Sequence, residues 1–229
     1  MAATLAWVLG ATGAWGGAIA RALLASGLDV VAVGRRAEPE LAAEAARSGR
    51  SHAFVRLDLA EPVPPLETLL ADVPEPLRRA PDVLVDAAFA NEGSREALVR
   101  ADFLAKAELI GSVAAAMRVR GSGRIGVLVG QNGRLGLAGL GDLSAPQGAL
   151  WAWAEALAEE LRAAPGDVRL TVVIPPRISS ATQRVMTERS GRSARLRPPD
   201  AAPIVRAMLA GRRRAGRRPA VAGLALLFR

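Results

Sequence analysis

The chain has 229 residues, of which 51% are hydrophobic and only 3% aromatic, so we expect one folded domain with a core of small side chains. It contains no cysteine, which excludes disulfides, thiolate metal sites and a cysteine nucleophile, and which fits a reducing cytoplasm. The net charge of +8 is carried almost entirely by arginine, because Lys106 is the only lysine.

Basic chains can bind nucleic acid or anionic surfaces. We attribute this charge instead to compositional bias and expect no nucleic-acid partner. No apolar run reaches membrane-spanning length, and the N-terminus lacks the basic segment of a signal peptide. We therefore expect a cytoplasmic protein with no membrane partner.

Apolar, β-branched runs alternate with alanine-rich helical stretches along the chain. In chain order, the pattern predicts a strand at 5–9, a helix at 14–25, a strand at 29–34, a helix at 39–47, strands at 53–57 and 83–88, one long or two abutting helices over 94–120, a strand at 124–129, a helix at 146–163, a strand at 168–174, a helix at 199–210 and a last strand at 219–227. Nearly continuous apolar strands are buried on both faces, and their alternation with helices gives parallel βαβ units. We predict a single α/β domain over 1–229, a doubly wound parallel sheet with helices on both faces.

The helix at 146–163 carries signals of its own. Ser144 and Gln147 have the Ser-x-x-Gln spacing of a capping box, and Pro146 suits a first helical turn. Trp151 lies off the apolar stripe, and we expect it at a subunit contact rather than in surface packing. The alanine-rich faces of this helix and of 105–118 favour close helix packing, so we predict a homo-oligomer, a dimer or a tetramer.

A glycine-rich loop, Gly10-Ala11-Thr12-Gly13-Ala14-Trp15-Gly16, joins the first strand to the first helix. Glycines allow a tight turn and close approach of a pyrophosphate to the backbone, while the helix N-terminus supplies free N–H groups. Because a strand precedes the loop and a helix and second strand follow, the context predicts a dinucleotide site rather than a merely structural turn.

The second strand ends in Gly34-Arg35-Arg36, where an NAD-binding protein would carry an acid for the ribose hydroxyls. The nearest acid, Glu38, lies past the arginines. An arginine here accommodates the 2′-phosphate of NADP, so we predict NADP(H) as the cofactor. Asp58, which ends the third strand, could accept from the adenine amino group or simply cap a loop.

These residues and the strand order resemble the short-chain dehydrogenase/reductase superfamily over nearly the whole chain. The G-x-x-G-x-x-G spacing is similar to that of its extended and atypical branches, and Val172 to Pro176 resembles the segment after its sixth strand, with Pro176 in place of glycine. The resemblance implies a Rossmann-type fold that binds NADP(H). The implied cofactor contacts are Gly10, Thr12, Gly13, Ala14, Trp15, Gly16, Arg35, Arg36, Asp58, Leu59, Ala87, Ala88, Pro175 and Ser180.

The catalytic positions of the family do not match. Its Tyr-x-x-x-Lys falls on Leu143 to Gln147, and the chain has no tyrosine. Its catalytic serine falls on Gly130, its helical asparagine on Asp102, and its Asn-Asn-Ala-Gly on Asp86 to Phe89. The resemblance therefore implies cofactor binding without the usual Tyr/Lys acid.

Asp86 and Asp102 are the candidate catalytic residues, because by the resemblance both lie near the nicotinamide end, where two carboxylates can raise one pKa. The alternative is ordinary hydrogen bonding at the ends of a strand and a helix. His52 is the only histidine, and we expect no metal site.

We predict an atypical NADP(H)-dependent oxidoreductase, similar to a ketoreductase, that acts on a small apolar carbonyl or hydroxyl compound. Two alternatives stay open. One is a non-redox enzyme on the same fold, such as a cyclase, isomerase or dehydratase. The other is an inactive NADP(H)-binding sensor that acts through a partner protein.

Overall fold

The computed structural model describes residues 4–136, 138–176, 184–185, 187–188 and 198–216. Within these residues one sheet contains seven parallel strands in the order β3-β2-β1-β4-β5-β6-β7. The strands are β1 Leu5–Leu9, β2 Asp29–Gly34, β3 His52–Arg56, β4 Val83–Asp86, β5 Ser122–Leu128, β6 Asp167–Ile174 and β7 Arg214–Gly216.

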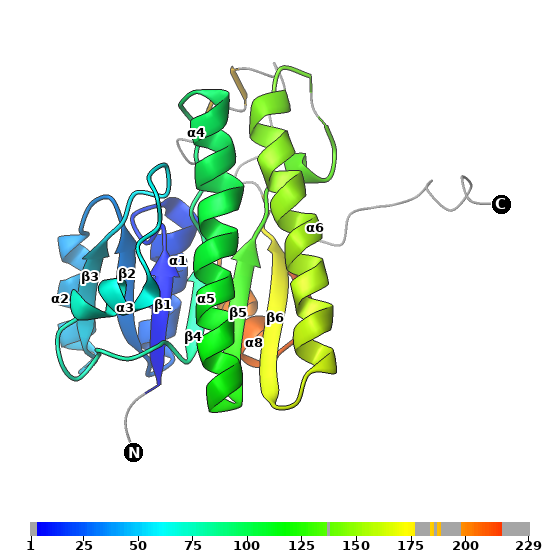
Figure 1. The fold of residues 1–229 in the computed structure, drawn as a ribbon. Coiled ribbons are helices and arrows are strands. Elements are labelled where there is room, and N and C mark those ends of the chain that lie inside the picture. The colour runs from blue at the N-terminus through cyan, green and yellow to red at the C-terminus, as the bar shows by residue number, and fades with distance from the viewer. Residues whose placement is uncertain (1–3, 137, 177–183, 186, 189–197, 217–229) are drawn as a thin grey trace.

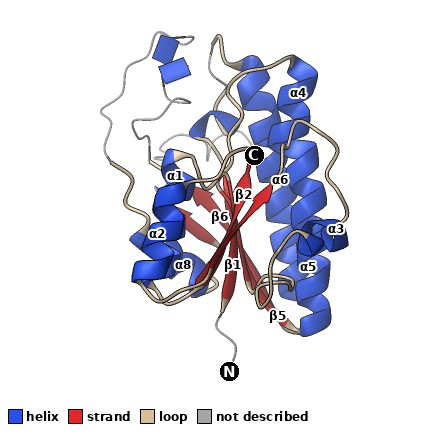
Figure 2. Cartoon of the chain, turned by 90° about the vertical axis from the view of Figure 1, so that its left-hand side faces the viewer, coloured by secondary structure: helices blue, strands red, loops and turns tan. Residues whose placement is uncertain are grey.

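Helices cover both faces of this sheet. The helices are α1 Ala14–Ala25, α2 Pro39–Arg47, α3 Leu66–Ala71, α4 Arg95–Val99, the π-helix η1 Arg100–Leu104, α5 Ala105–Arg120, the 3₁₀ helix η2 Gln131–Gly133, α6 Gly141–Ala163 and α8 Ala202–Leu209. Figure 2 shows the sheet between a layer of α1, α2 and α8 and a layer that contains α3, α5 and α6. Figure 1 shows α5 and α6 side by side across β4, β5 and β6. The doubly wound parallel sheet is thus confirmed.

The alternation of side chains along β1 explains the two layers. All five residues of β1 are buried. Leu5, Trp7 and Leu9 belong to the core under α5 and α6, whereas Ala6 and Val8 belong to the core under α1 and α8. Because successive strand residues point to opposite faces, a continuously apolar strand fills two cores at once.

The strands and helices start and end close to where the sequence places them, with a few differences. Over the stretch 94–120, α4, η1 and α5 follow one another without a break, so the run is continuous and only its middle turn is π-helical, and α3 was not expected. The predicted strand at 219–227 lies outside the described residues. None of the described helices is long and apolar enough to cross a membrane.

The capping-box interpretation of Ser144 is wrong. The helix starts at Gly141, five residues before the predicted start at Pro146, and the Ser144 N–H donates to the carbonyl of Leu140 within the first turn. The earlier start lets Leu140 and Leu143 bury themselves against Leu98, which a helix that began at Pro146 would not achieve.

Trp151 also differs from the expectation. Its side chain is buried in the core under α5 and α6 of its own chain. Arg134 covers its ring, with the guanidinium carbon 4.2 Å from the ring centroid. Trp151 is therefore packed within the chain instead of being presented to a second subunit.

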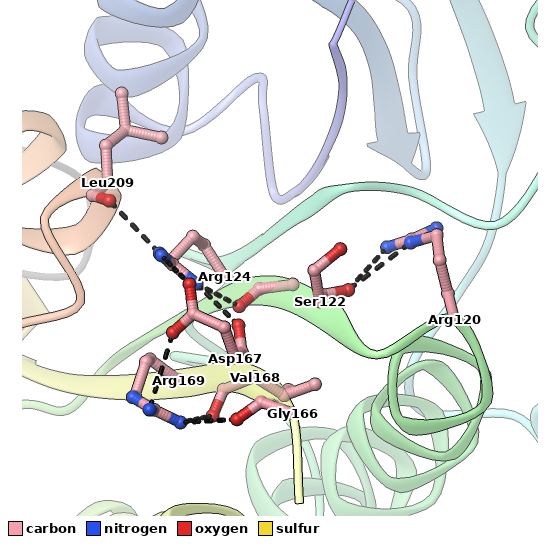
Figure 3. Close-up of polar contacts among 9 residues, drawn as sticks. Arg120, Ser122, Arg124, Gly166, Asp167, Val168, Arg169 and Leu209 are labelled. Atoms are coloured by element: carbon pink, nitrogen blue, oxygen red, sulfur yellow. Dashed lines mark hydrogen bonds and ion pairs between the residues drawn. The ribbon is translucent and has the colours of Figure 1, made fainter.

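Several arginines at the amino ends of β5 and β6 hold backbone carbonyl groups, as Figure 3 shows. Arg124 donates to the carbonyls of Leu209 and Asp167 at 3.1 and 2.7 Å and forms an ion pair with the Asp167 carboxylate at 2.7 Å. Arg120 donates to the carbonyl of Pro81 at 2.8 Å. These cations satisfy a carbonyl at the end of α8 and carbonyls at the starts of the strands, a structural use of positive charge.

Candidate cofactor and active-site cleft

A cleft of about 460 Å³ opens at the carboxyl ends of the strands. β1 lies between β2 and β4, so the chain crosses one way from β1 to β2 and the other way from β4 to β5. Ligands of open α/β sheets bind at such a reversal of strand order. The cleft begins there, between Gly10 after β1 and Ala88 after β4.

The glycine loop is built so tightly that side chains have no room in it. Gly10 has a φ of +73°, and a Cβ on it would lie 2.7 Å from the Cα of Ala88. A Cβ on Gly16 would lie 2.0 Å from the carbonyl oxygen of Gly10. The loop therefore brings the first turn of α1 directly against the end of β1.

The start of α1 fits a bound pyrophosphate. Gly13 is its N-cap and supplies no side-chain hydrogen bond, and no acid lies in the first turn. The loop residues Thr12 to Trp15 line the cleft. The free N–H groups and the positive end of the helix dipole thus face the cleft, as an anionic diphosphate requires.

The end of β2 fits a phosphorylated ribose. Arg35 and Arg36 are exposed and line the cleft. Glu38, the nearest acid, is held by Arg21 of α1 through an ion pair of 2.5 Å. Because Arg21 neutralises this carboxylate, the arginine pair dominates the charge at this end.

Nearly all of the predicted cofactor contacts lie in the cleft wall. Gly16 lies behind the wall and supports the loop, and Ser180 falls outside the described residues. Asp58 lines the cleft, as contact with an adenine requires. Its carboxylate also accepts a hydrogen bond from the N–H of Ala60 at 3.0 Å, so it caps the loop as well. The contacts in the wall are Gly10, Thr12, Gly13, Ala14, Trp15, Arg35, Arg36, Asp58, Leu59, Ala87, Ala88 and Pro175.

Beneath the cleft, Lys106 of α5 joins the two candidate aspartates. Its Nζ lies 3.3 Å from Asp86 Oδ2 and 3.1 Å from Asp102 Oδ1. The side chains of Lys106 and Asp86 have no exposed area, and Asp102 has 2%. The π-helical turn η1 places Asp102 against Lys106, one turn further along; such turns frequently occur at functional sites.

The same three side chains fasten the loop that follows β4. Lys106 Nζ donates to the carbonyl of Ala88 at 2.5 Å, and Asp86 Oδ1 accepts the Ala88 N–H at 3.1 Å. Asp102 Oδ1 accepts the Ala90 N–H at 3.0 Å. Since Ala87 to Ala90 line the cleft, the cluster fixes one of its walls.

Burial governs the charges in this cluster. Burial raises the pKa of Asp86 to about 6, although Lys106 works in the opposite direction. Burial alone would lower the pKa of Lys106, but the attraction of Asp102 and Asp86 outweighs it and the pKa is raised. Lys106 therefore stays protonated, with two carboxylates for one cation.

At the other end of the cleft, Gly130, Asn132 and Gln147 occupy the wall. A Cβ on Gly130 would lie 2.3 Å from Asn132 Oδ1, so the Asn132 side chain fills the space that a serine at 130 would need. Asn132 Nδ2 donates to the carbonyl of Leu143 at 3.1 Å and to Ser144 Oγ at 3.4 Å.

Sequence reasoning missed Lys106, and it considered Asn132 only as a residue that could orient a substrate oxygen. A signal for Lys106 was present, because the only lysine of the chain stands one turn after Asp102 in an otherwise alanine-rich helix. Nothing in the sequence shows that Asn132 packs under Gly130.

Among the described residues, no group of acids and histidine is placed to hold a metal ion.

Comparison with known proteins agrees with this geometry. The family model for short chain dehydrogenases matches residues 4–191, so the chain belongs to this family, whose activity is that of an oxidoreductase. No curated protein matches.

Solved structures show the same fold. A short-chain dehydrogenase from Streptomyces avermitilis is 24% identical over 95% of this chain and 89% of that one, with a TM-score of 0.75. A short-chain dehydrogenase from Sphingobium yanoikuyae in complex with NADPH is 22% identical over 96% and 89%, with a TM-score of 0.73. An actinorhodin polyketide ketoreductase variant with NADPH is 24% identical over 92% and 84%, with a TM-score of 0.72.

Proposed function

We propose that this chain is an atypical NADP(H)-dependent oxidoreductase, similar to a ketoreductase, that interconverts a small apolar carbonyl compound and its alcohol. The observation that carries the proposal is the cleft that runs from the exposed Arg35 and Arg36, past the uncapped start of α1, to Gly130 and Gln147. Its volume of about 460 Å³ lies in the usual range for small-molecule sites.

The cofactor preference rests on charge. Arg35 and Arg36 are available to the 2′-phosphate of NADP, while Arg21 occupies Glu38. Solved relatives of the same fold contain NADPH. We propose that the wall residues from Gly10 to Trp15, Ala87, Ala88 and Pro175 hold the cofactor, and that Ser180 contributes as the resemblance implies.

When bound, NADPH would supply the reducing equivalent; the chain's own residues orient the ligands and exclude water. Asp102 lines the cleft, whereas Asp86 lies behind it, so Asp102 is the better candidate for a proton donor. Solvent or an acidic group on the substrate is the other source of that proton.

One observation favours a second candidate, an NADP(H)-binding protein without redox turnover. Both aspartates are committed to Lys106 and to backbone N–H groups, so they serve the loop after β4 whether or not a reaction occurs. If neither aspartate can donate a proton, the protein lacks a general acid, and that absence typically lowers a reaction rate by about 10²–10⁴-fold.

Transfer of deuterium from 4-deuterated NADPH to a carbonyl panel would decide between the two. We expect deuterium in the alcohol product with the native protein, and none with Gly16→Ala, which blocks the loop. Gly141→Ala is the matched control, because a Cβ there meets nothing within 4 Å. Saturable NADPH binding without transfer to any compound would favour the second candidate.

A further inference from the structure

One buried hydrogen-bond donor in the cleft wall has no partner in the protein. Among the described residues, the buried side-chain atoms without a hydrogen-bond partner are Trp7 Nε1, His52 Nε2, Asp86 Oδ2 and Gln147 Nε2. Of their side chains, only that of Gln147 belongs to the cleft wall. A buried N–H group left unpaired is unfavourable, and a ligand in the cleft that accepted its hydrogen bond would remove that penalty.

The orientation of the Gln147 amide is fixed by its neighbour. The backbone N–H of Gly130 donates to Gln147 Oε1 at 2.9 Å. A backbone N–H cannot accept a hydrogen bond, so the atom facing Gly130 must be the oxygen of the amide. The NH₂ group is therefore the free end.

The backbone of Gln147 is also closely packed. A Cβ on Gly133 would lie 2.7 Å from the carbonyl carbon of Gln147, and a Cβ on Gly148 would lie 2.9 Å from the Gly133 oxygen. Two glycines thus allow η2 and α6 to touch backbone to backbone at this residue. With only 2% of Gln147 exposed, the donor is held in place before any ligand arrives.

Neighbouring amides in the same wall are already engaged. Asn132 Nδ2 donates to Leu143 and Ser144, and Gln131 Nε2 donates to the carbonyl of Pro175 at 3.4 Å. Within the part of the chain that the structure describes, Gln147 Nε2 is therefore the buried amide nitrogen of this wall that has no hydrogen-bond partner.

We propose that Gln147 Nε2 donates a hydrogen bond to an uncharged oxygen, a carbonyl or hydroxyl, of the molecule that fills this end of the cleft. An anionic oxygen is disfavoured, because the amide brings no charge and Asp102, in the same cleft, shares one cation with Asp86. The inference rests on the proposed function for the identity of the cleft's ligands, but it concerns binding and needs no turnover.

Gln147 cannot titrate, so it supplies no proton. If the bound oxygen is that of a reacting ketone, the amide stabilises the negative charge that develops on it during reduction by NADPH. A new C–H bond then forms, the C=O π bond becomes an O–H bond with a solvent proton, and NADPH is oxidised to NADP⁺.

The test uses the intact protein and two variants of Gln147. Gln147→Glu keeps an acceptor for the Gly130 N–H but replaces the NH₂ group by oxygen, and Gln147→Met removes the amide at similar length. Calorimetry measures the affinity for NADP⁺ alone and, with NADP⁺ present, for 2-tetralone and for tetralin, which lacks the oxygen. Thermal unfolding checks that each variant folds.

We expect both variants to bind one of the oxygen-bearing probes about 10-fold more weakly, with tetralin unaffected. Loss confined to 2-tetralone places the acceptor on the second ligand, and loss of NADP⁺ affinity places it on the cofactor. Acidification should restore binding to Gln147→Glu alone, because a protonated carboxyl regains a donor, whereas a purely structural role predicts no such recovery.

Gln131→Glu serves as the charge-matched control. It places the same carboxyl in the same wall and removes the bond to the Pro175 carbonyl, so the affinities themselves can change, but it leaves the Gln147 donor in place and the preference for 2-tetralone over tetralin should persist. The proposal is overturned if Gln147→Met binds NADP⁺ and 2-tetralone as tightly as the native protein, or if neither probe binds. Failure of deuterium transfer would instead reject the redox function and leave this result unchanged.

Discussion

Lys106 Nζ lies 3.3 Å from Asp86 Oδ2, and neither side chain has any exposed area. Because Asp102 shares the same cation, the cluster has one carboxylate more than its positive charge can neutralise. Burial raises the pKa of Asp86 to about 6, and the negative charge of Asp102 acts in the same direction. The folded protein therefore binds a proton at Asp86 more tightly than the unfolded chain does.

This proton binding predicts a pH-dependent stability. With a folded pKa above the unfolded one, Asp86 contributes stability below about pH 4 and loses it as pH rises through about 6. Asn cannot ionise, so Asp86→Asn should gain stability relative to the native protein over that interval, by roughly 2–3 kcal/mol. Denaturant unfolding from about pH 4 to pH 8 measures the difference.

Asp82→Asn is the control of opposite sign. Burial would raise the pKa of Asp82, but its bonds to Arg79 and to the Leu5 N–H outweigh burial and lower it. This variant should therefore lose stability relative to the native protein as pH rises above the range where Asp82 titrates. A flat difference between Asp86→Asn and the native protein would show that Asp86 has no raised pKa.

Lys106 itself offers a direct test of burial, because it is the only lysine in the chain. An amine-reactive acetylating reagent should modify the N-terminal amine of the folded protein and leave Lys106 unmodified. In denaturant both amines should react, and peptide mass spectrometry distinguishes them. Acetylation of Lys106 in the folded protein at the rate of the N-terminal amine would mean that the cluster opens to solvent.

The parts of this structure that the sequence could predict are those with a local cause. The apolar runs at β1, β2 and β6 and the glycine loop depend on nearby residues, and they lie where the periodicity places them. The start of α6 depends on a tertiary contact of Leu140 and Leu143 with Leu98. Local signals at Ser144 and Pro146 could not reveal that contact, so the expected start was wrong.

The candidate site also has parts that the sequence could predict and parts that depend on tertiary contacts. The arginines after β2 and the loop after β1 follow strands directly, so their positions in the cleft could be predicted. Asp102 and Lys106 are four residues apart on one helical run, so their pairing could be predicted, but Asp86 joins them from β4 only in the folded chain. The orientation of the free Gln147 amide depends on the hydrogen bond from the Gly130 N–H, which joins α6 to the loop before η2. Sequence spacing does not indicate this bond.

The glycine loop gives a steric prediction. Gly16→Ala should abolish cofactor binding and lower stability, because its Cβ would overlap the backbone carbonyl of Gly10 at 2.0 Å, and a backbone atom cannot rotate away. Gly141→Ala, with no atom within 4 Å of the new Cβ, should bind NADPH normally. Fluorescence titration with NADPH compares them, and tight binding by Gly16→Ala would contradict the geometry of the loop.

The outer face of the helical run over 100–120 leads to a prediction of assembly. Leu104 and Val119 of the helical run over 100–120 are 45% and 92% exposed, and small residues lie between them. We expect a homo-oligomer that covers this face, with Val119→Glu shifting it toward monomer. Light scattering at micromolar concentration measures the mass, and a monomeric native protein would remove the prediction.

The last prediction concerns the choice of cofactor. Arg35→Ala should weaken NADPH binding by about 10- to 100-fold and leave NADH binding nearly unchanged, because only NADPH carries the 2′-phosphate that a charge-assisted bond would hold. Arg47→Ala, an exposed arginine at the end of α2 that does not line the cleft, removes the same charge from a site that does not face the ligand.

A third variant tests whether the choice of cofactor also depends on the neutralisation of Glu38 by Arg21. Arg21→Ala releases Glu38 from its 2.5 Å ion pair, so a free carboxylate returns to the end of β2. NADPH binding should weaken through repulsion, and NADH binding should strengthen if Glu38 then reaches the ribose hydroxyls. Calorimetry of both cofactors on the three variants measures these changes. Equal affinity of the native protein for NADH and NADPH would refute the preference, since it would show that Arg35 and Arg36 hold no phosphate.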